Sequence, residues 1–186
     1  MVKKSACVFI SGKGSNLKNL IFKSRDYNFP INIKLVISNK KSAYGLSYAK
    51  RNSIPYFVVD TNLSNYENKI LMALRKYKIN FICLAGFMKI LSPYFLNYFK
   101  NKIINIHPSL LPKYKGLNTH KRALEAKEKF SGCTIHYVSK KLDSGKIIAK
   151  KKVKIFKKDT LKELEKRVLK EENKFYPIIL EKLIRS

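Results

Sequence analysis

Five short runs of apolar residues alternate with segments of helical periodicity between the N-terminus and His107. The runs are Ala6–Ser11, Ile31–Ser38, Tyr56–Val59, Phe81–Ala85 and Ile103–Ile106. Runs that are apolar on both faces are typical of parallel strands covered by helices on both sides of a sheet. Between the runs, apolar residues fall on one helical stripe, as Leu17, Leu20 and Ile21 do. This alternation predicts an α/β fold with a doubly wound, mostly parallel sheet.

The pattern changes after His107. We expect a loop containing Pro and Gly, a short helix, and two strands that a turn joins into an antiparallel pair. These elements are Leu110–Leu117, Thr119–Ala126, Thr134–Val138 and Ile147–Ile155, with the turn at Leu142–Gly145. A long amphipathic helix is predicted over Thr160–Leu183, with Asp159 or Thr160 as its N-cap and a bend at Pro177.

The composition is that of a folded, single-domain protein. The chain has 186 residues, of which 45% are hydrophobic, and compact domains usually have roughly 100–200 residues. No apolar stretch approaches the ~18 residues of a membrane span, and the run Ala6–Ile10 is too short for a signal peptide. Cys7, Cys83 and Cys133 lie far apart in apolar runs, which favours buried thiols over disulfides or a metal site. We therefore expect a cytoplasmic protein without membrane contact or metal.

The charge is far from balanced, and two explanations compete. Lys and Arg number 40 against 12 Asp and Glu, which gives a formal net charge of +28 at pH 7. The excess is mostly Lys spread over the whole chain, as an AT-biased coding sequence would produce. The alternative is attraction of a polyanion such as RNA, or of an anionic small substrate. Because the sequence does not show basic residues interleaved with exposed aromatic residues on one face, we do not expect a nucleic-acid partner.

A glycine-containing turn follows the first apolar run. Residues 11–16 read Ser-Gly-Lys-Gly-Ser-Asn and lead into the first helix. The glycines allow a tight turn that exposes backbone N–H groups at the positive end of the helix dipole, and Ser15 and Asn16 add side-chain donors. Such a turn suits a phosphate monoester, although its spacing matches neither a dinucleotide-binding loop nor a P-loop. A purely structural turn, with Ser15 as the helix cap, is the alternative.

Polar side chains also stand at the end of the fifth apolar run and in the later turn. Asn105 and His107 alternate onto one face of the predicted strand, at the end where open α/β sheets bind their ligands. A hydrogen-bonded strand end without catalytic function is the alternative. Asp143, taken alone, is an ordinary turn residue.

Five segments together resemble the phosphoribosylglycinamide formyltransferases. They read SGKGSN from Ser11, LAGFMKILSP from Leu84, NIHPSLLPKYKGLNTH from Asn105, GCTIHYV from Gly132 and LDSG from Leu142. The resemblance runs in order from about Ala6 to about Leu180 and implies a single domain with a Rossmann-like formyltransferase fold. It implies transfer of a formyl group from 10-formyltetrahydrofolate to the amine of 5-phosphoribosylglycinamide (GAR) in purine biosynthesis, with no metal. The phosphate-binding half would be about residues 1–100, and the catalytic, folate-binding half about residues 101–186.

The resemblance also assigns roles to individual residues. The catalytic residues would be Asn105, His107 and Asp143, with the proton transfers divided between the last two. GAR would be held by Gly12, Lys13, Gly14, Ser15, Asn16, Pro108 and Glu172. The folate would contact Phe87, Met88, Lys89, Ile90, Leu91, Val138 and Leu142. Without the resemblance, Phe87 and Met88 would be core residues and Glu172 a solvent-facing carboxylate, and the roles of His120 and His136 stay open.

Some features depart from the family pattern, and other functions compete. Lys146 stands where a proline often follows the turn, Ala149 and Lys150 replace a Gln-containing stretch, and the chain ends at Ser186 without the tail that relatives often have. Since no catalytic side chain is missing, we expect activity to be retained. The alternatives are a formyltetrahydrofolate hydrolase or another formyltransferase of the same superfamily, and, from a different class, a basic RNA-binding module.

Overall fold

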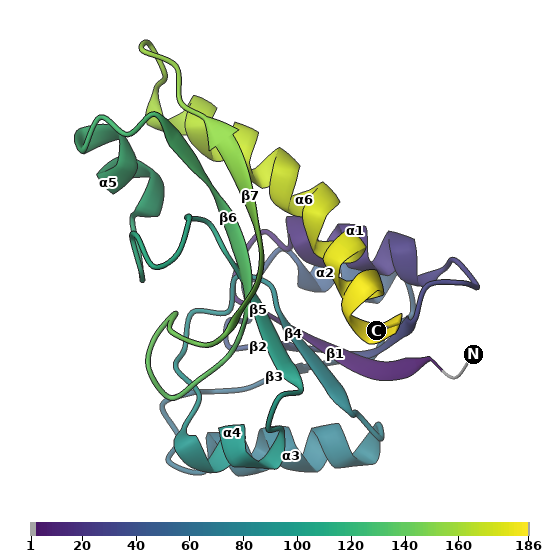
Figure 1. Cartoon of the computed structure of the whole chain (residues 1–186). Coiled ribbons are helices and arrows are strands. Elements are labelled where there is room, and N and C mark those ends of the chain that lie inside the picture. Colours follow the sequence, from purple (N-terminus) through teal and green to yellow (C-terminus); the bar gives the residue numbers. More distant parts are fainter. Residues whose placement is uncertain (1–2, 186) are drawn as a thin grey trace.

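The computed structural model describes residues 3–185 as a seven-stranded sheet with helices on both faces (Figure 1). The strand order is β3-β2-β1-β4-β5-β6-β7. The strands are β1 (Lys4–Ile10), β2 (Ile31–Ser38), β3 (Tyr56–Val58), β4 (Phe81–Leu84), β5 (Ile103–His107), β6 (Phe130–Tyr137) and β7 (Ile147–Lys154). Neighbouring strands from β3 to β5 are parallel, and β6 and β7 pair antiparallel with their neighbours. The predicted fold class is thereby confirmed.

Two helical layers cover the sheet. The helices are α1 (Ser15–Ser24), α2 (Leu46–Arg51), α3 (Tyr66–Lys76), α4 (Pro93–Tyr98), α5 (Thr119–Glu125) and α6 (Leu161–Arg185). Figure 1 shows α3 and α4 on one side of the sheet and α1 and α6 on the other. The side chains of β1 alternate between the two cores: Val8 packs in the core with α1 and α6, and Phe9 packs in the core with α3 and α4. Burial on both sides explains why β1 is apolar at successive positions.

Two elements differ from the sequence-based expectation. Helix α4 was not predicted, although Ser92 caps it by accepting a hydrogen bond from the backbone N–H of Phe95, and Pro93 occupies its first turn. Strand β6 begins at Phe130, four residues before the predicted Thr134. The Ser-Gly pair at 131–132 resembles a turn, but a Cβ on Gly132 would lie 2.0 Å from the Lys151 carbonyl oxygen. Gly132 therefore allows β6 and β7 to approach closely and continue their ladder.

The long C-terminal helix begins with a reciprocal cap. The backbone N–H of Glu163 donates to Thr160 Oγ1, and Glu163 Oε2 accepts from the backbone N–H of Thr160 at 2.8 Å. This capping box assigns the N-cap role to Thr160 rather than Asp159. The helix continues through Pro177, which lies inside it. Because α6 packs against α1, it brings Glu172 to the glycine turn at the start of α1.

Candidate active site

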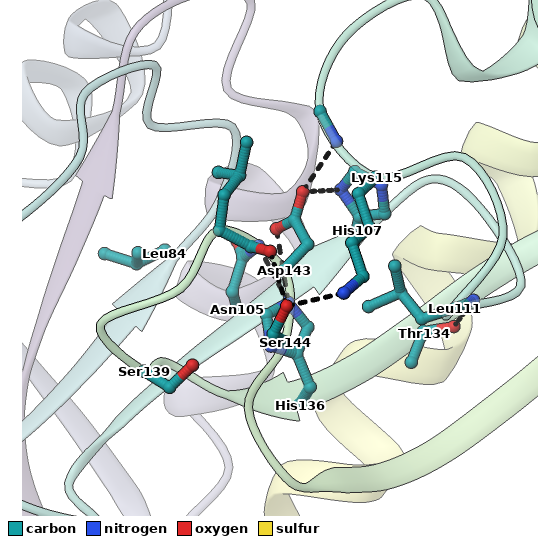
Figure 2. Close-up of polar contacts among 12 residues, drawn as sticks. Leu84, Asn105, His107, Leu111, Lys115, Thr134, His136, Ser139, Asp143 and Ser144 are labelled. Atoms are coloured by element: carbon teal, nitrogen blue, oxygen red, sulfur yellow. Dashed lines mark hydrogen bonds and ion pairs between the residues drawn. The ribbon is translucent and has the colours of Figure 1, made fainter.

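The carboxyl end of β5 carries two polar side chains next to the antiparallel strand β6. Asn105 pairs in register with His136, and His107 with Thr134. Residues directly opposite each other in a ladder point to the same face, so Asn105, His107 and His136 project together, as Figure 2 shows. The prediction that Asn105 and His107 share one face is confirmed by this register.

Asp143 reaches this cluster from the hairpin between β6 and β7 (Figure 2). The hairpin is tight: a Cβ on Gly145 would lie 1.7 Å from the Tyr137 carbonyl oxygen. Asp143 has a φ of 46°, which Asp tolerates better than most residues. Its Oδ2 accepts a hydrogen bond from the backbone N–H of Gly116 at 2.9 Å and lies 3.3 Å from Nδ1 of His107. Its carboxylate therefore binds the 110–117 loop and the histidine, rather than forming a local turn.

The contacts of His107 define where its ring carries protons. Nε2 lies 2.9 Å from the backbone carbonyl oxygen of Tyr114, and a carbonyl can only accept, so Nε2 must carry a proton. Nδ1 faces the Asp143 carboxylate at 3.3 Å. That contact is attractive only when a proton lies between the two groups, on either the imidazole or the carboxyl. His107 and Asp143, whose side chains are 7% and 8% exposed, thus form a buried pair, and their contact is an ion pair when the imidazole carries both protons.

His136 belongs to the same network but was not among the predicted site residues. Its Nε2 lies 3.2 Å from Nδ2 of Asn105 and 3.6 Å from Oδ1 of Asp143, and its Nδ1 lies 2.9 Å from the backbone carbonyl oxygen of Tyr137. Burial is the main cause that lowers the pKa of His136 below its ordinary value, while the Tyr137 carbonyl and the Asp143 carboxylate oppose that effect. The only sequence signal for this contact was the position of His136 within the GCTIHYV segment.

A cavity of about 710 Å³ opens beside these groups. Asn105, His107 and Asp143 line it, together with Pro108. All the residues predicted to contact a folate line it as well: Phe87, Met88, Lys89, Ile90, Leu91, Val138 and Leu142. Met88, Ile90 and Leu142 are more than half exposed, so they are partly available to a ligand rather than consumed by the core. The same cavity is lined by Lys40 and Lys121, which the sequence did not suggest, and by His120, whose role the sequence left open.

His120 supplies an unsatisfied polar atom on this cavity wall. Its Nδ1 is buried and has no hydrogen-bond partner among residues 3–185. Burial lowers the pKa of His120 from its ordinary value of 6.5, the nearby Glu165 opposes that effect, and His107 adds to it. Because buried polar atoms are normally paired, the cavity fits a ligand that carries polar groups as well as an apolar ring.

The glycine turn lies next to Glu172 and is not part of the cavity wall. Gly14 adopts a left-handed conformation (φ 71°) immediately before α1, and no side chain in the described part of the chain caps that helix. Ser15 is therefore not the helix cap, and the first N–H groups of α1 are left for another acceptor. Nδ2 of Asn16 donates to Oε2 of Glu172 at 2.9 Å, while Oδ1 of Asn16 is buried and has no hydrogen-bond partner within the described residues 3–185.

Glu172 is buried, contrary to the solvent-facing position expected from the helix alone. Burial raises its pKa to about 7, and the hydrogen bond from Asn16 partly opposes the rise. A carboxyl group that titrates near neutral pH in a buried site is more common at functional sites than elsewhere.

Ser11 connects the two parts of the site. Its Oγ lies 2.5 Å from Oδ1 of Asn39, to which it donates, and accepts the backbone N–H of Met88 at 2.7 Å. The loop after β4, which lines the cavity, is thus tied to the end of β1, where the glycine turn begins.

The described residues offer neither a metal site nor a membrane-spanning helix. Between residues 3 and 185, no group of three or more His, Cys, Asp or Glu side chains is arranged to hold a metal ion. In the same part of the chain, no helix is both long and apolar enough to cross a membrane. The thiols of Cys7, Cys83 and Cys133 are free and buried, as predicted.

Asn105 and His107 at the end of a strand in an open α/β sheet, with Asp143 beside them and an apolar cavity in front, form the kind of site at which enzymes of this architecture bind small molecules. The family model described as "Formyl transferase" matches residues 4–180. The chain belongs to this family.

Named relatives agree with this assignment. A phosphoribosylglycinamide formyltransferase of Haemophilus influenzae is 44% identical over 181 residues, covering 95% of this chain and 85% of the relative. The human trifunctional purine biosynthetic protein adenosine-3 is 41% identical over 183 residues, covering 96% of this chain and 18% of that longer protein. The crystal structure of a phosphoribosylglycinamide formyltransferase from Brucella melitensis superposes with a TM-score of 0.93 at 40% identity, covering 99% of this chain and 97% of that one.

Proposed function

We propose that the chain transfers a formyl group from 10-formyltetrahydrofolate to the amine of GAR, a step of purine biosynthesis. The observation that carries the proposal is the position of Asn105, His107 and Asp143 on the wall of the cavity that the predicted folate residues also line. The names of the relatives support formyl transfer to phosphoribosylglycinamide and a place in purine biosynthesis. A reaction between two small soluble molecules also fits the sequence-based expectation of a cytoplasmic enzyme.

The folate would occupy the apolar cavity. A volume of about 710 Å³ lies within the range of small-molecule sites. Phe87 and Val138 would contact the ring on its faces, while backbone groups between Met88 and Leu91 would hydrogen-bond its edge. Lys89 is exposed at the rim and would pair with the acidic tail of the folate.

GAR would extend from the glycine turn to the cavity. Its phosphate would accept hydrogen bonds from the free N–H groups after Gly14 and from Ser15 and Asn16. Lys13, exposed in the same turn, would add positive charge, and Glu172 would bind the sugar or amine end. The chain would thus hold the phosphate in its first half and carry out the chemistry in its second, as the sequence suggested.

Asn105 would stabilise the charge that develops when the amine of GAR attacks the formyl carbon. The attack places negative charge on the formyl oxygen, and an amide N–H at a fixed position stabilises that oxyanion more than the starting carbonyl. One N–H of Asn105 is engaged by His136 and the other has no partner among the described residues, which leaves it available for this role.

His107 and Asp143 would move the proton from the amine to the departing folate nitrogen. Oδ1 of Asp143 lies 3.6 Å from Nε2 of His136, which is too long for a hydrogen bond, and it accepts no hydrogen bond from the described residues 3–185. Its lone pairs are therefore free to accept the amine proton, directly or through a water. A doubly protonated His107 would then give its Nδ1 proton to the folate nitrogen as the C–N bond to the folate breaks. In total, one C–N bond forms between GAR and the formyl carbon, one C–N bond to the folate breaks, and the amine loses one proton while the folate nitrogen gains one.

The test is the absorbance change on folate release from a 10-formylfolate donor mixed with purified protein and GAR. We expect release that requires GAR and falls by about two to four orders of magnitude in His107→Ala. Release without GAR would favour a hydrolase. No release by a folded protein would remove the transferase proposal, and RNA titration at two salt concentrations would then test the remaining alternative.

A further inference from the structure

His136 lies between Asn105 and the backbone of its own strand, and its hydrogen bonds restrict its tautomer. Nδ1 is 2.9 Å from the carbonyl oxygen of Tyr137, which can only accept, so Nδ1 carries a proton. In the neutral ring, Nε2 then carries a lone pair. The contact with Asn105 at 3.2 Å is a hydrogen bond only if Asn105 donates, which places its Nδ2 and not its Oδ1 toward the ring.

The orientation of the Asn105 amide decides what it offers to the substrate. With Nδ2 bound to His136, the second N–H of the same nitrogen stays free as a donor. Rotation of the amide by half a turn would put Oδ1 in that position, and an acceptor would repel a developing oxyanion. Asn105 has no other recorded side-chain hydrogen bond in the described part of the chain, so His136 is the group that distinguishes the two orientations.

We propose that His136 is a positioning residue that fixes the Asn105 amide with its donor nitrogen on the catalytic side, and that it does so only as a neutral ring. A doubly protonated ring would donate from Nε2 and would require Oδ1 of Asn105 to face it. The proposal rests on the proposed function, because the donor matters only if an oxyanion forms.

The surroundings of His136 favour the neutral ring. Its side chain is 2% exposed, and burial is the first cause that lowers its pKa below 6.5. The titratable groups that face it are Asp143, at 3.6 Å, which favours the charged ring, and His107, which disfavours it. Burial outweighs the opposing effects of the Tyr137 carbonyl and the Asp143 carboxylate, so the pKa of His136 stays below 6.5 and the ring is neutral at pH 7.

Two amide substitutions separate this role from a structural one. In His136→Gln the amide oxygen replaces Nε2 as the acceptor for Asn105 and does not titrate. In His136→Asn the amide nitrogen replaces Nδ1 as the donor to Tyr137, and Asn105 loses its partner. We expect His136→Asn to lower kcat by about tenfold or more with little change in either KM, and His136→Gln to stay within about threefold of the parent. If His136 served only to hold the Tyr137 carbonyl, His136→Gln would lower kcat more than His136→Asn does, and that result would overturn the proposal.

The effect must also pass through Asn105. In an Asn105→Ala background, His136→Asn should cause no further loss of kcat, whereas independent effects would multiply. As the pH is lowered below 6.5, kcat should fall less steeply in His136→Gln than in the parent, because one group whose protonation reverses the amide has been removed. If kcat falls equally steeply with decreasing pH in the parent and in His136→Gln, the proposal is contradicted.

A readout without catalysis keeps the proposal testable if a variant does not fold or if the proposed function fails. The chain has 3 histidines, so ¹⁵N spectra of the histidine-labelled protein can be assigned with single substitutions. We expect His136 as the Nδ1–H tautomer, with a pKa below 6.5. A neutral Nε2–H tautomer would refute the geometry regardless of the reaction, whereas an inactive parent with the expected tautomer would refute only the proposed function.

Discussion

Replacement of Glu172 by Gln tests the energetics of the buried carboxyl. At a pKa of about 7 against an ordinary 4.5, ionisation of Glu172 is opposed by burial. The difference between the two pKa values corresponds to about 3 kcal/mol, at about 1.4 kcal/mol per pKa unit. The folded state binds the proton more tightly than the unfolded state does. The contribution of the protonated group is therefore fully present below pH 4.5 and is lost as the pH rises toward and through 7.

A Gln at this position is neutral at every pH and keeps an oxygen that can accept from Asn16. Glu172→Gln should therefore raise the free energy of unfolding by about 3 kcal/mol at pH 8 and by less than about 1 kcal/mol at pH 5. In a chain of this length, the gain at pH 8 corresponds to an increase in Tm of about 6–12 °C.

Urea unfolding followed by circular dichroism at the two pH values, without substrates, measures this difference. Glu165→Gln, an exposed position on the same helix, is the matched control and should change the unfolding free energy by less than about 0.5 kcal/mol at either pH. An equal gain for Glu172→Gln at pH 5 and pH 8, or none at pH 8, would refute the reasoning. The same substitution should raise the KM for GAR if Glu172 binds its sugar or amine end.

Three further predictions concern the site. Asp143→Asn removes the carboxylate that faces Nδ1 of His107, so kcat should fall by about two orders of magnitude or more in the folate-release assay; loss of less than threefold would exclude Asp143 from proton transfer. Gly14→Ala places a Cβ 2.5 Å from the Cα of Gly45 at a positive φ, so denaturant unfolding should show a loss of about 1–3 kcal/mol, and the KM for GAR should rise. Lys89→Ala should raise the KM for a polyglutamylated folate more than that for a monoglutamate, and added salt should reduce the difference; an equal change for both would separate Lys89 from the folate tail.

The sequence predicted the strands well because burial on both faces leaves a local signature. Both strands of the long antiparallel pair were also predicted, but the start of β6 was not. Gly132 is needed there because the Lys151 backbone of β7 lies so close to it, and that contact cannot be seen in the local sequence of β6. Helix α4 was missed although its Ser-Pro start is local, since its 6 residues are too few to show a helical stripe.

The chemistry of the site was predictable in part. Asn105 and His107 follow from the period of one strand, and the register of β5 with β6 confirmed their common face. Their assignment as catalytic residues, and that of Asp143, came from the family resemblance and stays a prediction. His136 could not be found from local pattern, because its partner Asn105 is 31 residues away and its role depends on which ring nitrogen carries a proton.

Strand β7 forms one end of the sheet, and its lysines affect how copies of the protein meet. An edge strand leaves backbone groups that another chain can pair with, and natural proteins often protect such edges with lysine. Lys150, Lys152 and Lys154 are exposed at alternate positions along this edge. Two copies that joined edge to edge through β7 would bring these like charges against one another, which destabilises the pairing. We therefore expect the lysine-rich edge to oppose aggregation, and neutralising it should make the protein less soluble without changing the reaction.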